Sequence, residues 1–503
     1  MTISINKNNI PDYLKESELY DNIDSNDNID IPIEYFDEKF EIKTFDDLTK
    51  YIKILNFWMI KKIPHEFYKF VFNNKNKIDV DELNKIFDKN YLIDEIYMII
   101  YNIHKLEFDI NYIYLQFNES FNGYVNDLPN FITHLKFGKS FNKPVDNLPN
   151  SITYLEFGYN FNQPVDNLPN SIIQLKLGHN FIRPINNLPN SIKELVLGDY
   201  FNHSVNNLPN SITNLNFGFM FNRSVNQLPK SITQLTFGYY FNQSVDNLPD
   251  SLIELTFGNN FNGSVDNLPC NIKHLTFGNN FNRSVNNLPY NIKHLTFGSY
   301  FNSSVDNLPH SITHLIFCDI FNKEINNLPN SITHLTLSWE YNLPINNLPN
   351  SITYLKCDGN FNQPINNLPN SITQLLIGCK FNQPINNLPT SLTHLKIQES
   401  SIFNYPIDNL PETLTHLTLN HRFNQPINNL PKSINHLVFG HYFNQSVDNL
   451  PTSLKYLKFG WSFNQPVNNL PNSITDLIFG WNFNQPVNNL PKSINYLKFK
   501  SMS

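Results

Sequence analysis

Hydrophobic residues return at fixed positions every 20 residues through most of this chain. A unit that starts at Phe121 is followed by another at Phe141, and nineteen such starts occur up to Phe483, one of them a tyrosine, Tyr341. The apolar positions of the first unit are Phe121, Val125, Leu128, Ile132, Leu135 and Phe137. A fixed period of this length predicts a solenoid, in which each unit packs only against its neighbours.

The end of each unit predicts a short β-strand. Apolar and polar side chains alternate in residues 131–137, and Gly138 follows. Stacked units are expected to place these strands in a parallel sheet on the concave face, with extended segments and turns on the convex side. The proline of each unit, such as Pro149, fits an extended segment that needs no ladder hydrogen bond. Leu115 and Phe117 predict a half unit before the first complete one.

An asparagine follows the opening aromatic residue of every unit except one, where Ile182 replaces it. We expect each amide to lie inside its coil and to bond the backbone of the turn, so that stacked units form a ladder of amides. A buried polar group that recurs in this way needs a hydrogen-bond partner each time.

The amino-terminal part of the chain has a different pattern. Residues 1–43 are polar and acidic and predict a poorly ordered lead-in. Residues 44–110 predict a small α-helical domain, because Thr44 can cap a helix that Pro64 ends, and Asp79 with Glu82 forms a capping box for another. We expect this domain to cap the array, which occupies residues 111–503.

Composition narrows the classes of function. Charged residues make up 16% of the 503 residues and the formal net charge is −7. This charge balance does not predict the basic surface that binds nucleic acid. The four cysteines share no short spacing, so the sequence favours neither a zinc site nor disulfides and suits a reducing compartment. No signal-peptide pattern and no apolar run near 18 residues is found. We expect an intracellular, cytoplasmic protein without a membrane partner.

The sequence does not predict an enzyme. It contains no nucleophile elbow, glycine-rich phosphate loop, His-Glu-x-x-His or paired-carboxylate motif. A residue that recurs in many units is also a poor candidate for a unique catalyst. We therefore expect no catalytic residues, no metal and no cofactor.

Two variable columns flank the inward leucine of each strand. Positions that differ between units are free of the packing that holds the coil, so these columns are the candidate binding surface. The second column is mostly threonine in the middle of the array, with lysines towards both ends. In the first column, the candidate protein-binding residues are His274, His294, His314, His334, Tyr354, His394, His416 and His436.

Four of these histidines belong to consecutive units. Because neighbouring strands lie ~4.8 Å apart, their rings are expected to stand roughly 5 Å apart. Imidazole is a common metal ligand, but a metal site also needs convergent geometry. We favour an exposed row of histidines that recurs because the units are duplicated, with a metal site as the alternative.

Aromatic residues also gather just after the strands, and Trp339, Trp461 and Trp481 are candidate edge anchors for a partner. The glycine that ends most strands is replaced at several places between Cys318 and Asn420, where two residues are also inserted. Residues 318–422 have two interpretations: a distinct binding segment, or drift at a position that tolerates left-handed backbone.

The spacing resembles the FNIP repeat, written here as Phe161-Asn-Gln-Pro164 and Phe361-Asn-Gln-Pro364. That family is a short relative of the leucine-rich repeat and is common in amoebae and their giant viruses. Ile272-Lys-His-Leu-Thr-Phe277 is similar to the leucine-rich pattern, and Leu268-Pro269 to the turn of its shortest class. The resemblance implies a leucine-rich-like solenoid over residues 111–503 and a non-enzymatic protein-interaction scaffold. For a viral member, the location would be the host cytoplasm.

Family members often carry an F-box before the repeats, which implies a second function, substrate recognition for an SCF-type ubiquitin ligase. Ile63-Pro-His-Glu-Phe67 is similar to the opening of an F-box, but residues 69–90 do not follow its apolar pattern. The candidate partners are therefore unidentified proteins, with a Skp1-like adaptor as the alternative for residues 44–110. End-to-end self-association is a further hypothesis, because the last unit has no cap motif.

Overall fold

The computed structural model describes residues 2–6, 28–32, 114–126, 128, 130 and 132–500. The helical domain over residues 44–110 lies outside this part and stays a prediction. Strands β1 (Thr2–Asn6) and β2 (Asn28–Pro32) pair antiparallel, with Ser4 opposite Asp30. The sequence did not predict this pair within residues 1–43, and the order of the rest of that segment stays a prediction.

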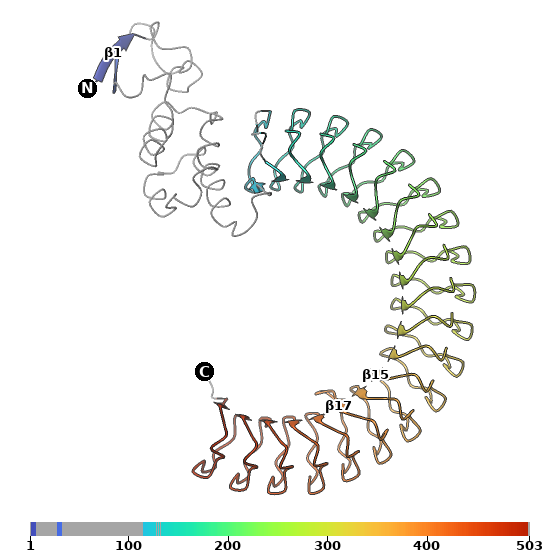
Figure 1. Cartoon of the computed structure of the whole chain (residues 1–503), viewed down its shortest axis with the longest axis vertical. Helices are drawn as coiled ribbons and strands as arrows, with labels where there is room; N and C mark the ends of the chain where they lie inside the picture. Colours follow the sequence, from blue (N-terminus) through green and yellow to red (C-terminus); the bar gives the residue numbers. More distant parts are fainter. Residues whose placement is uncertain are drawn as a thin grey trace. The chain divides into compact units, whose positions relative to one another are not determined.

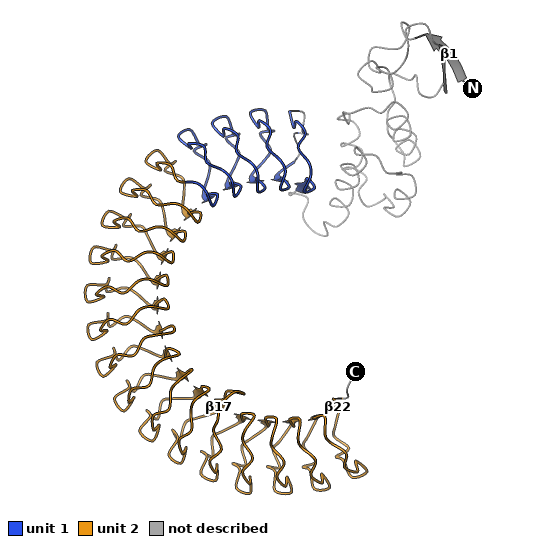
Figure 2. Ribbon diagram, turned by 180° about the vertical axis from the view of Figure 1, so that it is seen from behind, with its two compact units in different colours: residues 1–201 blue, residues 202–503 orange. Residues whose placement is uncertain are grey.

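From residue 114 onwards each coil contributes one short strand (Figure 1). The strands are β3 Tyr114–Gln116, β4 His134–Lys136, β5 Tyr154–Glu156, β6 Gln174–Lys176, β7 Glu194–Val196, β8 Asn214–Asn216, β9 Gln234–Thr236, β10 Glu254–Thr256, β11 His274–Thr276, β12 His294–Thr296, β13 His314–Ile316, β14 His334–Thr336, β15 Tyr354–Cys357, β16 Gln374–Ile377, β17 His394–Ile397, β18 His416–Thr418, β19 His436–Val438, β20 Tyr456–Lys458, β21 Asp476–Phe479 and β22 Tyr496–Phe499. Two compact units divide the chain, residues 1–201 with β3–β7 and residues 202–503 with β8–β22 (Figure 2).

Within each unit the neighbouring strands pair in parallel and in strict register. Leu275 of β11 lies opposite Leu295 of β12, and the same leucine position is aligned in the other pairs of the two units. In unit 2 the strands line the inner side of the curve and the connecting loops the outer side (Figure 2). The predicted parallel solenoid of about nineteen turns is confirmed.

Stacked phenylalanine rings form the core of the coils. Phe141 and Phe161 are fully buried, with ring centroids 5.9 Å apart. Each also stacks on the ring at the strand end of the preceding coil, as Phe141 does on Phe137 at 3.8 Å. Since an isolated coil leaves both faces of these rings in water, burial of the rings depends on the coils above and below.

The asparagine ladder is present, but its geometry differs from the prediction. Asn262 accepts a hydrogen bond at its Oδ1 from the backbone N–H of Asn282 in the next coil, at 3.0 Å. Asn242 bonds Asn262 in the same way at 2.9 Å. The amides therefore join successive coils, and these asparagines are exposed or half-buried instead of lying inside the coil. The backbone N–H that faces the preceding coil thus finds its acceptor in the asparagine side chain of that coil.

Glycine at the strand end lets adjacent coils approach closely. A Cβ on Gly278 would lie 2.0 Å from the carbonyl oxygen of Gly258, a distance that no side chain accepts. Where the sequence departs from glycine, the local structure changes. At one such position, buried Asn420 donates from its Nδ2 to the carbonyls of Ser401 and Phe403 at 2.8 and 3.0 Å.

Candidate functional site

The strand residues on either side of the inward leucine form the candidate surface, here called the strand face. Leu275, Leu295 and Leu315 are almost fully buried, whereas the residues before and after each of them are half-buried or exposed. Side chains in a strand alternate between its two faces, so both flanking columns point away from the core. The two variable columns therefore lie on the surface, where the sequence placed them.

Four consecutive histidines of the first column stack as a row, the first histidine row. The ring centroids of His274 and His294 are 4.5 Å apart, those of His294 and His314 are 4.2 Å apart, and those of His314 and His334 are also 4.2 Å apart. Tyr354 continues this row at 5.6 Å. The rings are nearly parallel, with interplanar angles of 11° to 21° between the histidines.

The remaining three predicted histidines form a second histidine row. His394 stacks on His416 at 4.1 Å, and His416 on His436 at 5.2 Å. Tyr456, which lies opposite His436 on the next strand, extends this row at 4.2 Å from His436. Gln374 separates the two rows in sequence and register. The eight candidate residues thus form two stacks, and their role in binding stays a prediction.

A neighbouring threonine fixes the orientation of several of these imidazoles. Thr313 donates its one hydroxyl proton to the carbonyl oxygen of Lys293 at 3.1 Å, so the same hydroxyl can only accept from Nδ1 of His314 at 2.9 Å. The neutral His314 ring then carries its proton on Nδ1. Its Nε2 is left as a hydrogen-bond acceptor, and the same arrangement recurs at His334, His394 and His416.

Stacking also keeps the middle imidazoles neutral. Burial lowers the pKa of His294 and His314 below the usual value, and the neighbouring histidines of the row lower it further. Two imidazolium rings face to face would place like charges against each other. Among the described residues no group of three or more His, Cys, Asp and Glu side chains is arranged to hold a metal ion.

We expect the stability of the array to fall as the pH drops below neutrality. Because the folded state lowers the pKa of His294 and His314, the unfolded state binds more protons once the pH passes below about 6.5. Their contribution is therefore complete above that pH and is lost as the pH falls through the lowered pKa values. Urea midpoints at pH 7.5 and 5.5 should differ less in a His294→Gln, His314→Gln double variant than in the unchanged chain.

His310→Gln is the matched control, since His310 is exposed and lies in a loop. It should leave the pH dependence as it is. An equal pH dependence in the double variant and the unchanged chain would contradict the stacked, neutral row.

A charged cluster on the strand face of unit 1 was not foreseen. Glu156 lies 2.8 Å from Nζ of Lys136 and 3.8 Å from Nζ of Lys176, and it accepts a hydrogen bond from the hydroxyl of Tyr154. Burial alone would raise the pKa of Glu156, but these partners outweigh it and the pKa is lowered. The signal available in the sequence was the lysine, glutamate, lysine order in the second column of three successive coils.

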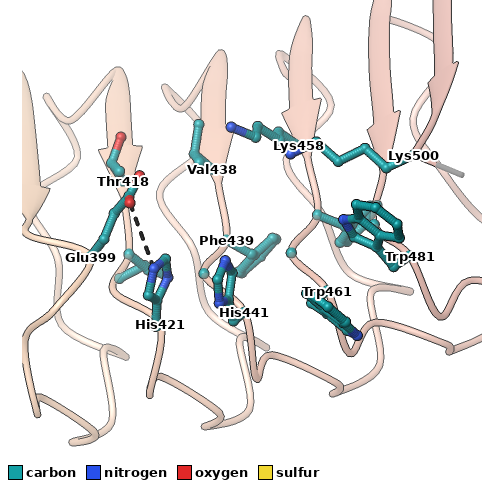
Figure 3. Close-up of a pocket in the computed structure, with 15 residues that line it drawn as sticks. Glu399, Thr418, His421, Val438, Phe439, His441, Lys458, Trp461, Trp481 and Lys500 are labelled. Carbon is teal, nitrogen blue, oxygen red and sulfur yellow. Dashed lines mark ion pairs between the residues drawn. The ribbon is translucent and has the colours of Figure 1, made fainter. Parts of the chain in front are cut away.

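A groove runs along the strand ends of β18–β22, with a volume of about 180 Å³ (Figure 3). Its wall is a row of side chains from equivalent positions, His421, His441, Trp461 and Trp481, and Lys458 and Lys500 lie on the other side. The two predicted anchors Trp461 and Trp481 stack on each other with centroids 5.3 Å apart.

The sequence did not single out the two histidines of this wall. His421 and His441 stack at 3.6 Å, and Nε2 of His421 lies 3.6 Å from a carboxylate oxygen of Glu399. Burial lowers the pKa of His421, as does His441, against the opposing effect of Glu399. The third predicted anchor, Trp339, is exposed but does not line the groove. The available signal was that all four wall residues directly follow a strand-end position.

Stacked 20-residue coils, each with one strand in a parallel sheet and a leucine turned inward, define a leucine-rich-repeat-like solenoid. The protein belongs to the FNIP repeat family. The family model, FNIP Repeat, matches twelve segments, at residues 117–160, 144–180, 180–220, 221–260, 284–319, 321–357, 341–380, 361–400, 403–442, 423–462, 443–469 and 463–501. The predicted resemblance is confirmed, and the fold is of the kind that serves as a protein-interaction scaffold.

The solved structures that are similar to this chain include two that cover more than three quarters of it. One is that of CroV588, a giant-virus protein described as a novel circular LRR protein, with 45% sequence identity and a TM-score of 0.68. The match covers 77% of this chain and 65% of CroV588, so the chain spans about two thirds of that relative. The other is YopM from Yersinia enterocolitica, with 19% identity and a TM-score of 0.46 over 86% of this chain and 100% of YopM.

No curated protein matches the sequence. In the part of the chain that the structure describes, no helix has the length and apolar character needed to cross a membrane.

Proposed function

We propose that this protein is a non-enzymatic scaffold that binds partner proteins along its strand face. The observation that carries the proposal is the first histidine row, a stack of His274, His294, His314 and His334 held on a parallel sheet. A side chain that is already ordered loses little conformational entropy when a partner covers it. The row therefore offers a prepared surface instead of one that must form on binding.

The chemistry of the strand face suits a protein partner. Rings present flat apolar faces, and the threonine bonds leave imidazole acceptors for N–H and O–H groups of a partner. Interfaces are typically rich in aromatic side chains with a few directed polar groups. The core positions hardly change from coil to coil, whereas these columns do change, and such variation is the expected mark of a surface adapted to a particular partner.

Partner capture from a cell extract tests the proposal. In one variant the four histidines of the first histidine row become serine, and in a matched control Cys270, Tyr290, His310 and Asn330 become serine. The control positions are exposed, lie in the loops and belong to the same stretch of the array. Quantitative mass spectrometry should show proteins captured by the unchanged chain and by the control, and lost from the histidine variant.

This comparison is valid only if the histidine variant keeps its fold. A urea midpoint equal to that of the unchanged chain establishes that it does. Partners that stay bound to the histidine variant and leave the loop-side control would contradict binding through the strand face. Catalysis on small substrates would contradict the non-enzymatic scaffold.

One finer hypothesis concerns residues 44–110, which the described residues do not include. A role as the substrate-recognition subunit of an SCF-type ubiquitin ligase requires residues 44–110 to bind a Skp1-like adaptor, which a pull-down with that adaptor tests. End-to-end self-association is kept as a hypothesis, which the mass of the protein in light scattering at micromolar concentration tests. A cytoplasmic location is proposed from the sequence alone.

A further inference from the structure

We propose that the groove along the strand ends of β18–β22 binds an acidic peptide segment of a partner protein and takes up one aromatic side chain of that segment. The proposal rests on the proposed function, since it assumes that the protein binds other proteins. It assigns a second binding site, which lies beside the second histidine row and differs from it in the groups it presents.

The groove exists because glycine ends the strands on its floor. Gly440, Gly460 and Gly480 carry no side chain, and a Cβ on Gly460 or Gly480 would collide with the preceding glycine's carbonyl oxygen at 1.9 and 1.7 Å. The residue after each glycine therefore forms the wall. In the last coils of the array these wall residues are Trp461 and Trp481, which gives a continuous aromatic surface (Figure 3).

The wall is open to a ring from outside. Trp461 is 44% exposed and Trp481 is 37% exposed, although the two rings already stack with an interplanar angle of 20°. Aromatic rings gain from offset stacking beyond the area they bury. The volume of about 180 Å³ is below the ~300 to 1,000 Å³ of small-molecule sites. It fits one large side chain better than a cofactor.

Charge around the groove favours an acidic partner. Lys458 and Lys500 lie across from the tryptophans (Figure 3). Residues 441–500 hold five lysines against two aspartates, although the whole chain has a net charge of −7. One of these aspartates, Asp448, lies in a loop and is bonded by Ser446 at 2.7 Å. Glu399 marks the opposite, acidic end of the groove beside His421.

A second aromatic pair at equivalent positions in unit 2 lacks this combination. Phe219 and Tyr239 stack at 4.7 Å at equivalent positions, but the adjacent strands β8 and β9 end in Asn216 and Thr236, which are uncharged. A single nucleic-acid strand also combines anions with rings, yet it needs a long basic track and several stacking sites. Two lysines and a space for one ring suit a peptide better.

Fluorescence polarisation with a defined peptide tests the proposal. The probe is a labelled 12-residue peptide with one central phenylalanine among aspartates and glutamates, and the matched probes replace the phenylalanine with alanine or the acids with their amides. The full chain should bind the first peptide and bind either matched peptide about tenfold more weakly. Binding should also weaken as salt is raised, because exposed charges are screened.

Two kinds of variant identify the groove. Trp481→Ala removes part of the wall, and Lys500→Gln removes an exposed charge without touching the core, so it keeps the test valid if the tryptophan variant misfolds. Each should weaken the acidic peptide about tenfold. Trp339→Ala is the control, as an exposed tryptophan at the equivalent position outside the groove, and should leave binding unchanged.

The proposal is overturned if the acidic peptide does not bind at about 100 μM, a weak limit for a specific site, or if it binds equally to the Lys500→Gln and Trp481→Ala variants. It is also overturned if a labelled 12-mer of deoxythymidine binds more tightly and loses binding in the same variants. Partner capture by the first histidine row is measured separately, so failure of the peptide would leave the proposed function standing.

Discussion

Replacement of Gly278 by alanine should destabilise unit 2 by about 3 kcal/mol, at the upper end of the usual cost of overpacking. The new methyl group would lie 2.0 Å from the carbonyl oxygen of Gly258 and 2.8 Å from the Cα of Asn259. Both are backbone atoms of the preceding coil, so no side-chain rotation can relieve the contact. The two coils must separate, which breaks strand pairing between β10 and β11.

Urea unfolding followed by tryptophan emission measures this effect, because Trp339, Trp461 and Trp481 all lie in unit 2. Gly263→Gln is the matched control, since the preceding unit carries Gln243 at the equivalent position. It should change the urea midpoint little. Equal midpoints for Gly278→Ala and the unchanged chain would mean that the coils do not approach each other as closely as the structure describes.

Substitution of Phe261 by alanine should cost about 3 to 5 kcal/mol, the usual loss for a fully buried phenylalanine. The ring is 0% exposed and lies between Phe241 and Phe281, each 6.1 Å away, with Phe257 at 3.9 Å. The vacated space exposes the faces of both neighbouring rings. Because coils pack only on their neighbours, we expect the defect to weaken the coupling between the two sides of the array.

Hydrogen exchange is the measurement for this variant, together with the urea midpoint. Amides of the coils on either side of Phe261 should lose protection first, and the urea transition should broaden. Phe219→Ala is the control, because that ring is 44% exposed. Similar losses of stability in the two variants would argue against a core that depends on continuous ring stacking.

Much of the fold could be predicted because each unit repeats the same local information. The alternation around Leu135 and the glycine that follows it identify a strand, and eighteen further copies support the same assignment. Phe141 and Phe161 are buried as expected. The period also identifies which side chains are neighbours, so the stacking of His274 on His294 could be foreseen to within about an ångström.

The structure departs from the predictions where the 20-residue period does not determine which polar groups bond each other. The period did not indicate that the Asn262 amide bonds the next coil instead of its own turn. The Lys136, Glu156, Lys176 order was present in the sequence, but spacing alone did not indicate that Glu156 binds the lysines of both adjacent strands. In each case the outcome depends on how the backbone of one coil approaches another and on which rotamer then meets a partner.

The sequence by itself determined the repeat, the parallel strands, the buried rings and the family, because all of these follow from residue type and spacing along a column. Only the tertiary structure decided the groove that joins Trp481 and Lys500, since they come from different coils and columns. The tertiary structure also decided the tautomer of His314, because that tautomer depends on which acceptor the Thr313 hydroxyl donates to. Spacing fixes neighbours within a column, whereas contacts between columns require the path of the backbone in space.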